Sequence, residues 1–236
     1  MQCTHCGSRN YVNNGSYKGI RRYKCKECSR YFSDKVRKFT YQDKERFLQL
    51  YLNNVGVNKA AMFMKCSPSL IVRWIREFAD NLRQKMSQAA NSLENQIPDI
   101  IEMDEIYTRI KKRGNSTPIW TASSRRRGQI VAYCIGKGRD RAIELYNKAK
   151  QAVGKIEHIY TDGNSCNHEA FTDYGVKEPH TIALGKSQTH LIESFNSSMR
   201  DNLARFNRKS KRYSKTLEML DNTLLLFFNK HIISIK

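Results

Sequence analysis

The sequence predicts a multidomain α+β protein: a small cysteine-rich module, then a helical segment, then a larger domain of mixed α/β structure. Three observations support this prediction. Two Cys-x-x-Cys pairs lie near the N-terminus, apolar residues then recur at helical spacing, and strand-like and helical segments alternate after Pro98. We therefore divide the chain into residues 1–39, residues 40–81, a linker at 82–98 and a C-terminal domain at 99–236.

The composition favours an anionic partner. The 236 residues include 42 Lys and Arg against 22 Asp and Glu, a formal net charge of +20, and 39% are hydrophobic. This hydrophobic fraction suffices for a core and excludes a disordered chain, while the surplus positive charge favours nucleic acid as a partner. Met1 is not followed by an apolar signal segment, and the most apolar run, 224–228, is far shorter than the roughly 20 residues that cross a bilayer. We expect a cytoplasmic protein with no membrane segment.

The first module has the spacing of a four-cysteine zinc ribbon. The predicted Zn²⁺ ligands are Cys3, Cys6, Cys25 and Cys28, in two Cys-x-x-Cys pairs. Four thiolates leave no open coordination position, so such a site is structural. Two disulfides are the alternative, which a reducing compartment disfavours. Between the pairs, Asn13-Asn14-Gly15 predicts the turn of a β-hairpin.

Residues 40–81 have the pattern of three short helices. Thr40 is the predicted N-cap of the first, with Asp43 three residues on, and residues 53–56 end that helix. The second covers Asn58–Met64. The third begins at Ser67-Pro68, which places a cap and a proline at a helix start, and it runs to Phe78 or beyond.

The second and third of these helices predict a helix-turn-helix. The exposed face of the third would then carry the DNA contacts, namely Ser69, Arg73 and Arg76. An ordinary three-helix bundle explains the apolar pattern equally well. The net charge and the adjoining ribbon favour DNA binding.

The C-terminal domain reads as a meander followed by a crossover. The predicted elements are strands at Ile100–Ile110, Pro118–Ser124 and Gln129–Ile135, a helix at Arg141–Val153, a strand at Ile156–Thr161 and helices from Gln188 to His231. A fourth strand reached through a helix fits an α+β layered sheet.

Three acids in this domain are candidate metal ligands. Asp104 lies in an otherwise apolar strand, where an ionised carboxylate is costly unless it is paired or binds a metal. Asp162 ends a second strand, and Glu193 lies on a helix. If the strands are neighbours, the carboxylates converge, and oxygen ligands of this kind suit two Mg²⁺ or Mn²⁺ ions. Glu102 and Glu105 are expected to be ordinary surface or ion-paired acids, with Glu105 on the opposite face of its strand.

Basic residues follow Glu193 along the same helix and beyond. Arg200 lies two turns after Glu193 and His190 lies one turn before it, so both are candidates for the catalytic site. Arg205, Arg208 and Lys209 are candidate phosphate contacts. A merely solvated basic face and a structural histidine are the alternatives.

These motifs resemble a known family. The string T-H-L-I-E-S-F-N-S-S-M-R-D-N-L-A-R-F-N-R-K-S-K-R-Y-S-K from Thr189, together with the segments around Asp104 and Asp162, is similar to the signatures of insertion sequence 1 transposases. The resemblance implies an RNase H-like domain, a triad of Asp104, Asp162 and Glu193, and Mg²⁺-dependent chemistry. It implies a prokaryotic, nucleoid-associated enzyme that cuts double-stranded DNA at the inverted-repeat ends of its element. The released 3′ hydroxyls are then joined to target DNA, and two ends imply a homodimer or larger assembly.

The match departs from the family at three positions. Tyr107 stands where tryptophan is expected, Ser194 where arginine is usual, and Ser210 where threonine is usual. None of the three is a proposed metal ligand. Two other functions stay open: a DNA-binding regulator with an inactive catalytic half, and a nuclease that cleaves without joining.

Overall fold

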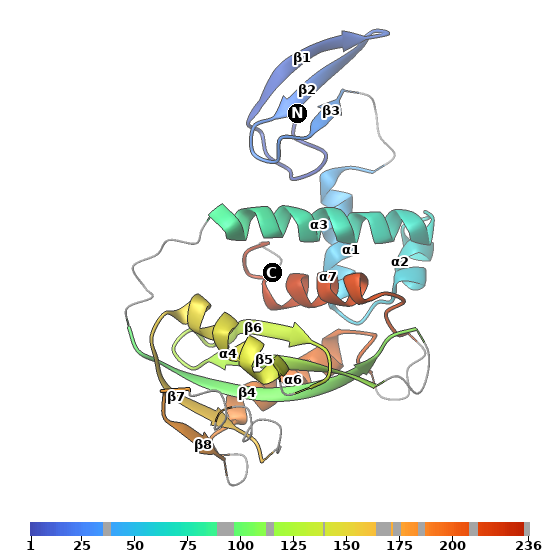
Figure 1. Ribbon diagram of the computed structural model, residues 1–236. Helices are drawn as coiled ribbons and strands as arrows, with labels where there is room; N and C mark the ends of the chain where they lie inside the picture. The colour runs from blue at the N-terminus through green and yellow to red at the C-terminus, as the bar shows by residue number, and fades with distance from the viewer. Residues whose placement is uncertain are drawn as a thin grey trace. The chain divides into compact units, whose positions relative to one another are not determined.

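The computed structural model divides the chain into two compact units (Figure 1). Unit 1 comprises Met1–Ala90 and Asn222–Lys236, and unit 2 comprises Asn91–Asp221. The structure describes residues 1–34, 39–88, 97–111, 116–138, 140–163, 171, 176–183, 187–207 and 212–233. Within those ranges, no helix combines the length and the apolar character needed to cross a membrane.

Unit 1 begins with a three-stranded antiparallel sheet in the order β1-β2-β3, formed by Tyr11–Tyr17, Ile20–Cys25 and Tyr31–Ser33. The hairpin turn predicted at Asn13–Gly15 is wrong. Tyr17 pairs with Ile20, so the turn is Lys18-Gly19, where both residues have positive φ as a two-residue hairpin turn requires. Asn13–Gly15 instead lies within β1, at an irregularity in its pairing with β2. An Asn-Gly pair also suits such a bulge, because its glycine accepts positive φ.

The helices of unit 1 agree closely with the prediction. They are α1, α2 and α3, formed by Tyr41–Leu52, Val57–Phe63 and Pro68–Gln88. The Thr40 side chain accepts from the Asp43 backbone while Asp43 caps Thr40 in return, a complete capping box. Ser67 Oγ likewise accepts from the amide of Leu70 at 3.2 Å, which starts α3. Both predicted caps are confirmed.

The third helix is longer than its predicted core. It continues to Gln88, so residues 82–88, which we expected in the linker, are helical. Arg73 and Arg76 are exposed along it, as is Ser69, while Trp74 and Ile75 are buried. This alternation gives α3 one apolar face toward the core and one polar face toward solvent.

A buried lysine ties the ribbon to the helices. Lys44 of α1 is only 6% exposed, and its Nζ donates to the carbonyl of Thr4 at 2.9 Å and to Glu77 Oε2 at 2.7 Å. Asn81 of α3 adds a hydrogen bond from its Nδ2 to the carbonyl of His5 at 2.9 Å. The first cysteine knuckle is thus hydrogen-bonded to both α1 and α3.

The end of the chain also belongs to unit 1. Helix α7 spans Leu217–Phe228, and its residues from Asn222 onward cluster with α1 and α3. Tyr51 Oη lies 2.7 Å from Thr223 Oγ1, and Arg83 Nη2 donates to Asn222 Oδ1 at 2.7 Å. The domain boundaries that we expected placed these residues with the sheet instead.

Unit 2 contains a mixed five-stranded sheet in the order β6-β5-β4-β7-β8. Its strands are Asp99–Arg109 (β4), Ser116–Ser124 (β5), Gln129–Ile135 (β6), Ile156–Thr161 (β7) and His180–Ile182 (β8). The first three form the predicted antiparallel meander, and β7 joins parallel to β4 after the helix α4, Asp140–Val153. Strand β8 was not predicted, because three residues carry too little pattern.

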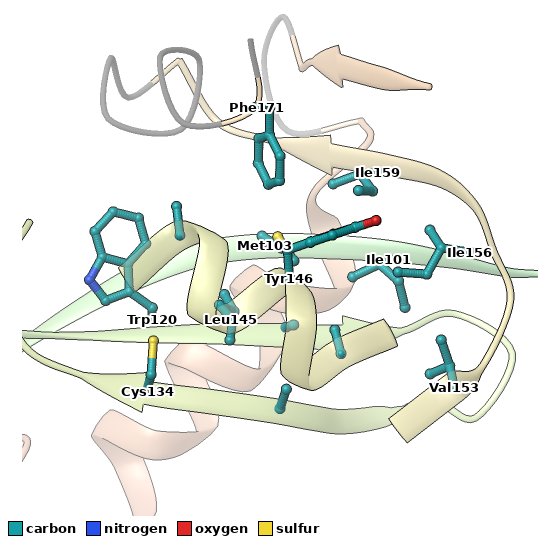
Figure 2. Close-up of a cluster of buried hydrophobic side chains, with 14 residues drawn as sticks. Ile101, Met103, Trp120, Cys134, Leu145, Tyr146, Val153, Ile156, Ile159 and Phe171 are labelled. Atoms are coloured by element: carbon teal, nitrogen blue, oxygen red, sulfur yellow. The ribbon is translucent and has the colours of Figure 1, made fainter. Parts of the chain in front are cut away.

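The two faces of this sheet have different partners. Helix α4 packs on one face, where Ile101 and Met103 of β4 contribute to the core (Figure 2). The alternate residues Glu102 and Asp104 face the helix α6, His190–Asn202, with which both make hydrogen bonds. The strand β4 therefore buries apolar side chains under one helix and directs its acids toward the other.

Candidate active site

Two of the predicted acids meet where β4 and β7 lie side by side. The parallel pairing of these strands ends at Met103 and Thr161, so Asp104 and Asp162 follow directly on adjacent strands. A carboxylate oxygen of Asp104 lies within 4.8 Å of one of Asp162. The convergence expected from the sequence is therefore present in the structure.

Glu105 also reaches this cluster, against expectation. It stands on the opposite side of β4 from Asp104, yet its carboxylate oxygen lies within 4.8 Å of those of Asp104 and Asp162. The β4–β7 pairing ends at Met103 and Thr161, before Glu105. Strand alternation, which predicted that Glu105 points away from Asp104, did not predict the position of its carboxylate.

Glu193 approaches the cluster from helix α6. It is half-buried in the first turn, where Thr189 Oγ1 donates to its Oε1 at 3.4 Å. Among the carboxylates that the structure describes, the group within 4.8 Å does not include Glu193. Its negative charge nevertheless acts on the ionisation of Asp104.

Asp104 is held in one orientation by two donors. Its Oδ1 accepts from the backbone N–H of Glu105, and its Oδ2 accepts from Asn196 Nδ2, both at 2.7 Å. Burial raises the pKa of Asp104 above its ordinary value, and the negative charges of Asp162 and Glu193 raise it further against the effect of these hydrogen bonds. The sequence reading missed Asn196, although its position one turn after Glu193 on the same helical face is the signal that could have identified it.

The acidic cluster fits a divalent cation. Mg²⁺ binds oxygen ligands at about 2.0–2.1 Å, so two carboxylate oxygens on one ion lie at most about 4.2 Å apart. The carboxylate oxygens of the cluster all lie within 4.8 Å of one another. Asp104, Asp162 and Glu105 can therefore hold a divalent ion with small side-chain adjustments, and Glu193 can supply a further oxygen from α6.

A buried ion pair fixes helix α6 against β4. Glu102 is fully buried, and its Oε2 accepts from the backbone N–H of Ile192 at 2.9 Å while its Oε1 accepts from Arg125 Nε at 2.7 Å. Arg125 also donates to the carbonyl of Gln188 at 2.7 Å and lies 4.7 Å from the ring of Tyr160. The carboxylate thus satisfies a free amide in the first turn of α6, the turn that carries Glu193.

Replacing Glu102 by glutamine should test this anchor. The amide of glutamine offers an oxygen to only one of the two donors, so either Ile192 or Arg125 loses its partner. The free energy of unfolding should therefore fall by about 1–3 kcal/mol. Chemical denaturation measures this loss. Glu157→Gln, at an exposed position on β7, is the matched control and should change stability little. Equal stability of the two variants would refute the anchoring role.

Arg200 and His190 are both exposed on α6. Arg200 lines a pocket together with Tyr107 and Arg109. His190 begins the helix, and no hydrogen bond joins its ring to a carboxylate of the described residues. Their catalytic roles remain predictions.

Of the three candidate phosphate contacts after α6, Arg205, Arg208 and Lys209, only Arg205 lies in the described part of the chain. Arg205 Nη1 donates to Ser214 Oγ at 2.7 Å and to the carbonyl of Met219 at 3.1 Å. These bonds hold the segment after α6 and give Arg205 a structural role that the sequence reading did not foresee. Arg208 and Lys209 lie outside the described residues.

The four cysteines of unit 1 have the geometry of a zinc site. Cys3 Sγ lies 3.7 Å from Cys28 Sγ, and Cys6 Sγ lies 3.6 Å from Cys25 Sγ. Tetrahedral Zn²⁺ with Zn–S bonds of about 2.3 Å places sulfurs roughly 3.8 Å apart, whereas a disulfide needs about 2.05 Å. Burial raises the pKa of Cys28 to about 11, so a bound cation would help to keep this thiol ionised at neutral pH. The distances favour zinc over the disulfide alternative.

Comparison with known proteins identifies the family of unit 2. The sequence profile described as IS1 transposase matches residues 99–234, more than half of the chain. None of the curated proteins matches the chain. The family match and the mixed five-stranded sheet agree with the RNase H-like fold that we expected.

Several solved structures show weak similarity to the chain. The magnesium-bound catalytic core of HTLV-2 integrase, in its trimeric form, is 19% identical, with 43% of this chain and 66% of the integrase core covered at a TM-score of 0.32. A pre-cleavage Mos1 transpososome is 10% identical, with 84% of this chain and 73% of that chain covered at a TM-score of 0.35. It is the match of the profile, over most of unit 2, that decides the assignment: the chain belongs to the IS1 transposase family.

Proposed function

We propose that this protein is a DNA transposase that binds the inverted-repeat ends of its insertion element, cleaves the DNA there and joins the 3′ ends to a target. The observation that carries the proposal is the meeting of Asp104 and Asp162 on adjacent strands, with Glu105 beside them and Glu193 on the facing helix. In a family of transposases, such a carboxylate cluster suits metal-dependent phosphoryl transfer.

The residues of the cluster have distinct roles in this proposal. Two Mg²⁺ or Mn²⁺ ions, when bound, would supply the activation of the attacking oxygen and the stabilisation of the leaving oxygen. Asp104 and Asp162 would hold these ions, and Glu193 would add a further ligand from α6. Asn196 keeps the Asp104 carboxylate in position through its hydrogen bond. Glu102 and Arg125 keep the first turn of α6 in place.

Cleavage assays on duplexes that carry the ends of the element test the proposal. Purified protein with Mg²⁺ should nick the duplex at the end of the repeat and transfer the 3′ end into a plasmid. Hydrolysis without joining would favour the nuclease, and binding without cleavage would favour the regulator. Because two ends must meet, the active form is expected to be a homodimer or larger assembly, acting on the nucleoid in the cytoplasm.

Unit 1 supplies the proposed DNA-binding surface. Helices α2 and α3 pack on each other, and Ser69, Arg73 and Arg76 are exposed on α3. This arrangement suits a helix-turn-helix whose second helix enters the major groove. The adjoining zinc ribbon adds exposed Lys and Arg side chains that suit phosphate contacts.

Salt titrations distinguish this surface from a plain helical bundle. If Arg73 and Arg76 bind phosphates, the double alanine variant should lower the slope of log K against log salt by about 0.9 for each phosphate that is no longer neutralised. Fluorescence anisotropy with the end duplex at several salt concentrations measures the slope. Lys85→Ala, exposed further along α3, is the matched control. An unchanged slope and affinity in the double variant would place the DNA elsewhere.

A further inference from the structure

Unit 2 contains a pocket that the catalytic carboxylates do not use. Its volume is about 300 Å³. It lies between the end of β4, the start of β5, the last turn of α6 and the segment that follows α6. The lining residues are Tyr107, Thr108, Arg109, Ser116, Arg200, Arg205, Phe206, Asn207 and Tyr213.

The pocket is cationic. Three arginines, Arg109, Arg200 and Arg205, line it, and none of the lining residues in the described part of the chain is acidic. A guanidinium presents several N–H donors in a plane that matches phosphate oxygens. The pocket is therefore suited to an anionic ligand that carries phosphate.

The arginines are partly fixed before any ligand arrives. Arg205 is held by Ser214 Oγ and by the carbonyl of Met219. The guanidinium carbon of Arg109 lies 5.8 Å from the centre of the Tyr213 ring. The backbone amide of Lys111 donates to the carbonyl of Ser214 at 2.9 Å, which joins the end of β4 to the segment after α6. Such preorganisation lowers the entropy lost on binding.

The pocket also offers aromatic surface. Tyr107 is 58% exposed although it lies on a central strand of the sheet, and Phe206 and Tyr213 are further lining residues. An exposed aromatic side chain beside arginines is the combination on which unpaired bases stack in proteins that bind single strands. Thr108, Ser116 and Asn207 add hydroxyl and amide groups to the lining.

The pocket lies a few residues along β4 from the carboxylate cluster. Tyr107 follows Asp104 by three residues on β4, which separates their backbones by roughly 10 Å at the rise of a strand. Stacked nucleotides of one strand are about 3.4 Å apart, so a strand whose phosphate lies at Asp104 can reach the pocket within about three nucleotides.

We propose that this pocket takes one nucleotide unstacked from the DNA near the scissile phosphate, with its base against Tyr107 and its phosphate beside the arginines. The volume lies at the lower end of the range of small-ligand pockets, about 300–1,000 Å³, and so suits a single nucleotide but no duplex. Removing one nucleotide from the stack would open the duplex where the metal site acts. The proposal rests on the proposed function, because it takes the element-end DNA as the ligand.

A fluorescence experiment tests the pocket without any cleavage. Element-end duplexes carrying 2-aminopurine at successive positions around the cut site are bound to the Asp104→Asn variant, which we expect to bind the DNA without cutting it. One position should change its emission severalfold on binding, because the emission of this base depends on stacking. Adding Tyr107→Ala should abolish the change at that position, whereas Tyr107→Phe, which keeps the ring, should preserve it. Arg109→Ala gives a second, independent variant should Tyr107→Ala fail to fold.

A cleavage experiment in the otherwise unaltered chain supplies the second measurement. Tyr107→Ala should slow cleavage of a fully paired duplex roughly tenfold to a hundredfold, as expected for the loss of one base stacked on one ring. A mismatch at the position whose 2-aminopurine emission changes should recover most of the lost cleavage rate, because an unpaired base is easier to unstack. Leu217→Ala, at another exposed apolar position, is the control and should cleave normally.

The two possible failures are distinguishable. A wild-type protein that cleaves no element end would overturn the proposed function. The pocket proposal would fall if no 2-aminopurine position responded, or if the same position responded equally with and without the Tyr107 ring.

Discussion

Replacing Asp104 by asparagine is expected to abolish cleavage of element-end DNA while leaving end binding intact. Asparagine cannot supply the anionic oxygen that a divalent ion needs, so the rate should fall by at least about 1,000-fold, which equals about 4 kcal/mol of transition-state stabilisation. Because Asp104 lies in unit 2 and the proposed DNA-binding surface lies in unit 1, affinity for the end should change little. Gel-based cleavage and anisotropy binding assays measure the two effects.

The same variant should be more stable than the wild type without metal. The folded state raises the pKa of Asp104 above 3.8, so folding disfavours its ionised form, and metal-free wild type loses stability as pH rises through that raised pKa. Asparagine removes this loss. The Asn196 amide, whose Oδ1 has no hydrogen-bond partner among the described residues, can flip to accept from the new amide. The Tm of Asp104→Asn should therefore exceed that of the wild type at neutral pH, and the difference should shrink toward pH 3.8. Retained cleavage, or a lower Tm at neutral pH, would contradict the assignment of Asp104.

Removing one zinc ligand should have a comparably large effect on unit 1. In Cys25→Ser the site loses a fully buried thiolate, and structural Zn²⁺ contributes about 10–16 kcal/mol to the folding of small zinc domains. The buried core of the ribbon consists of Cys3, Cys25, Cys28 and Phe32, with Cys6, Tyr11 and Tyr23 packed against it, which is too small to fold without the metal. The ribbon should unfold, and affinity for the element end should fall.

Elemental analysis and circular dichroism measure these changes. Zinc content should drop from one ion per chain to nearly none in Cys25→Ser. Cys66→Ser is the matched control, because Cys66 is half-buried in the same unit and lies outside the cysteine cluster. Full zinc content in Cys25→Ser would refute the four-cysteine site.

Local features of the structure were predictable because their causes are local. The Thr40 cap, the start of α3 at Ser67 and the strand that carries Asp104 each depend on residues a few positions apart. The hairpin turn was not predictable by the same means, since Asn-Gly at 14–15 suits both a turn and a bulge. The pairing of Tyr11 with Cys25, which places the turn near residues 18–19, decides between the two.

The supporting residues of the site depend on contacts between distant segments. Glu102 meets the amide of Ile192 from 90 positions away, and Asp104 meets Asn196 from 92. No periodicity in the sequence indicates which backbone amide a glutamate on a strand will contact. The sequence therefore predicted only an ordinary surface or ion-paired acid at Glu102. Glu105 shows the same limit on a smaller scale, because its carboxylate meets that of Asp162 only where the pairing of β4 with β7 brings the two segments together.

The buried ammonium of Lys44 has a consequence for how this protein can be recombined with its relatives. Its two partners, the carbonyl of Thr4 and the carboxylate of Glu77, come from the ribbon and from α3, so neither segment alone satisfies it. A chimaera joined near residue 39 would keep the ion pair between Lys44 and Glu77 but would have to supply a carbonyl where Thr4 now stands. A ribbon that placed no carbonyl there would leave a buried ammonium donor unsatisfied, at a cost of about 1–3 kcal/mol. Exchanging the ribbon and the three helices between elements as one unit should avoid this loss, which links the evolution of the two parts.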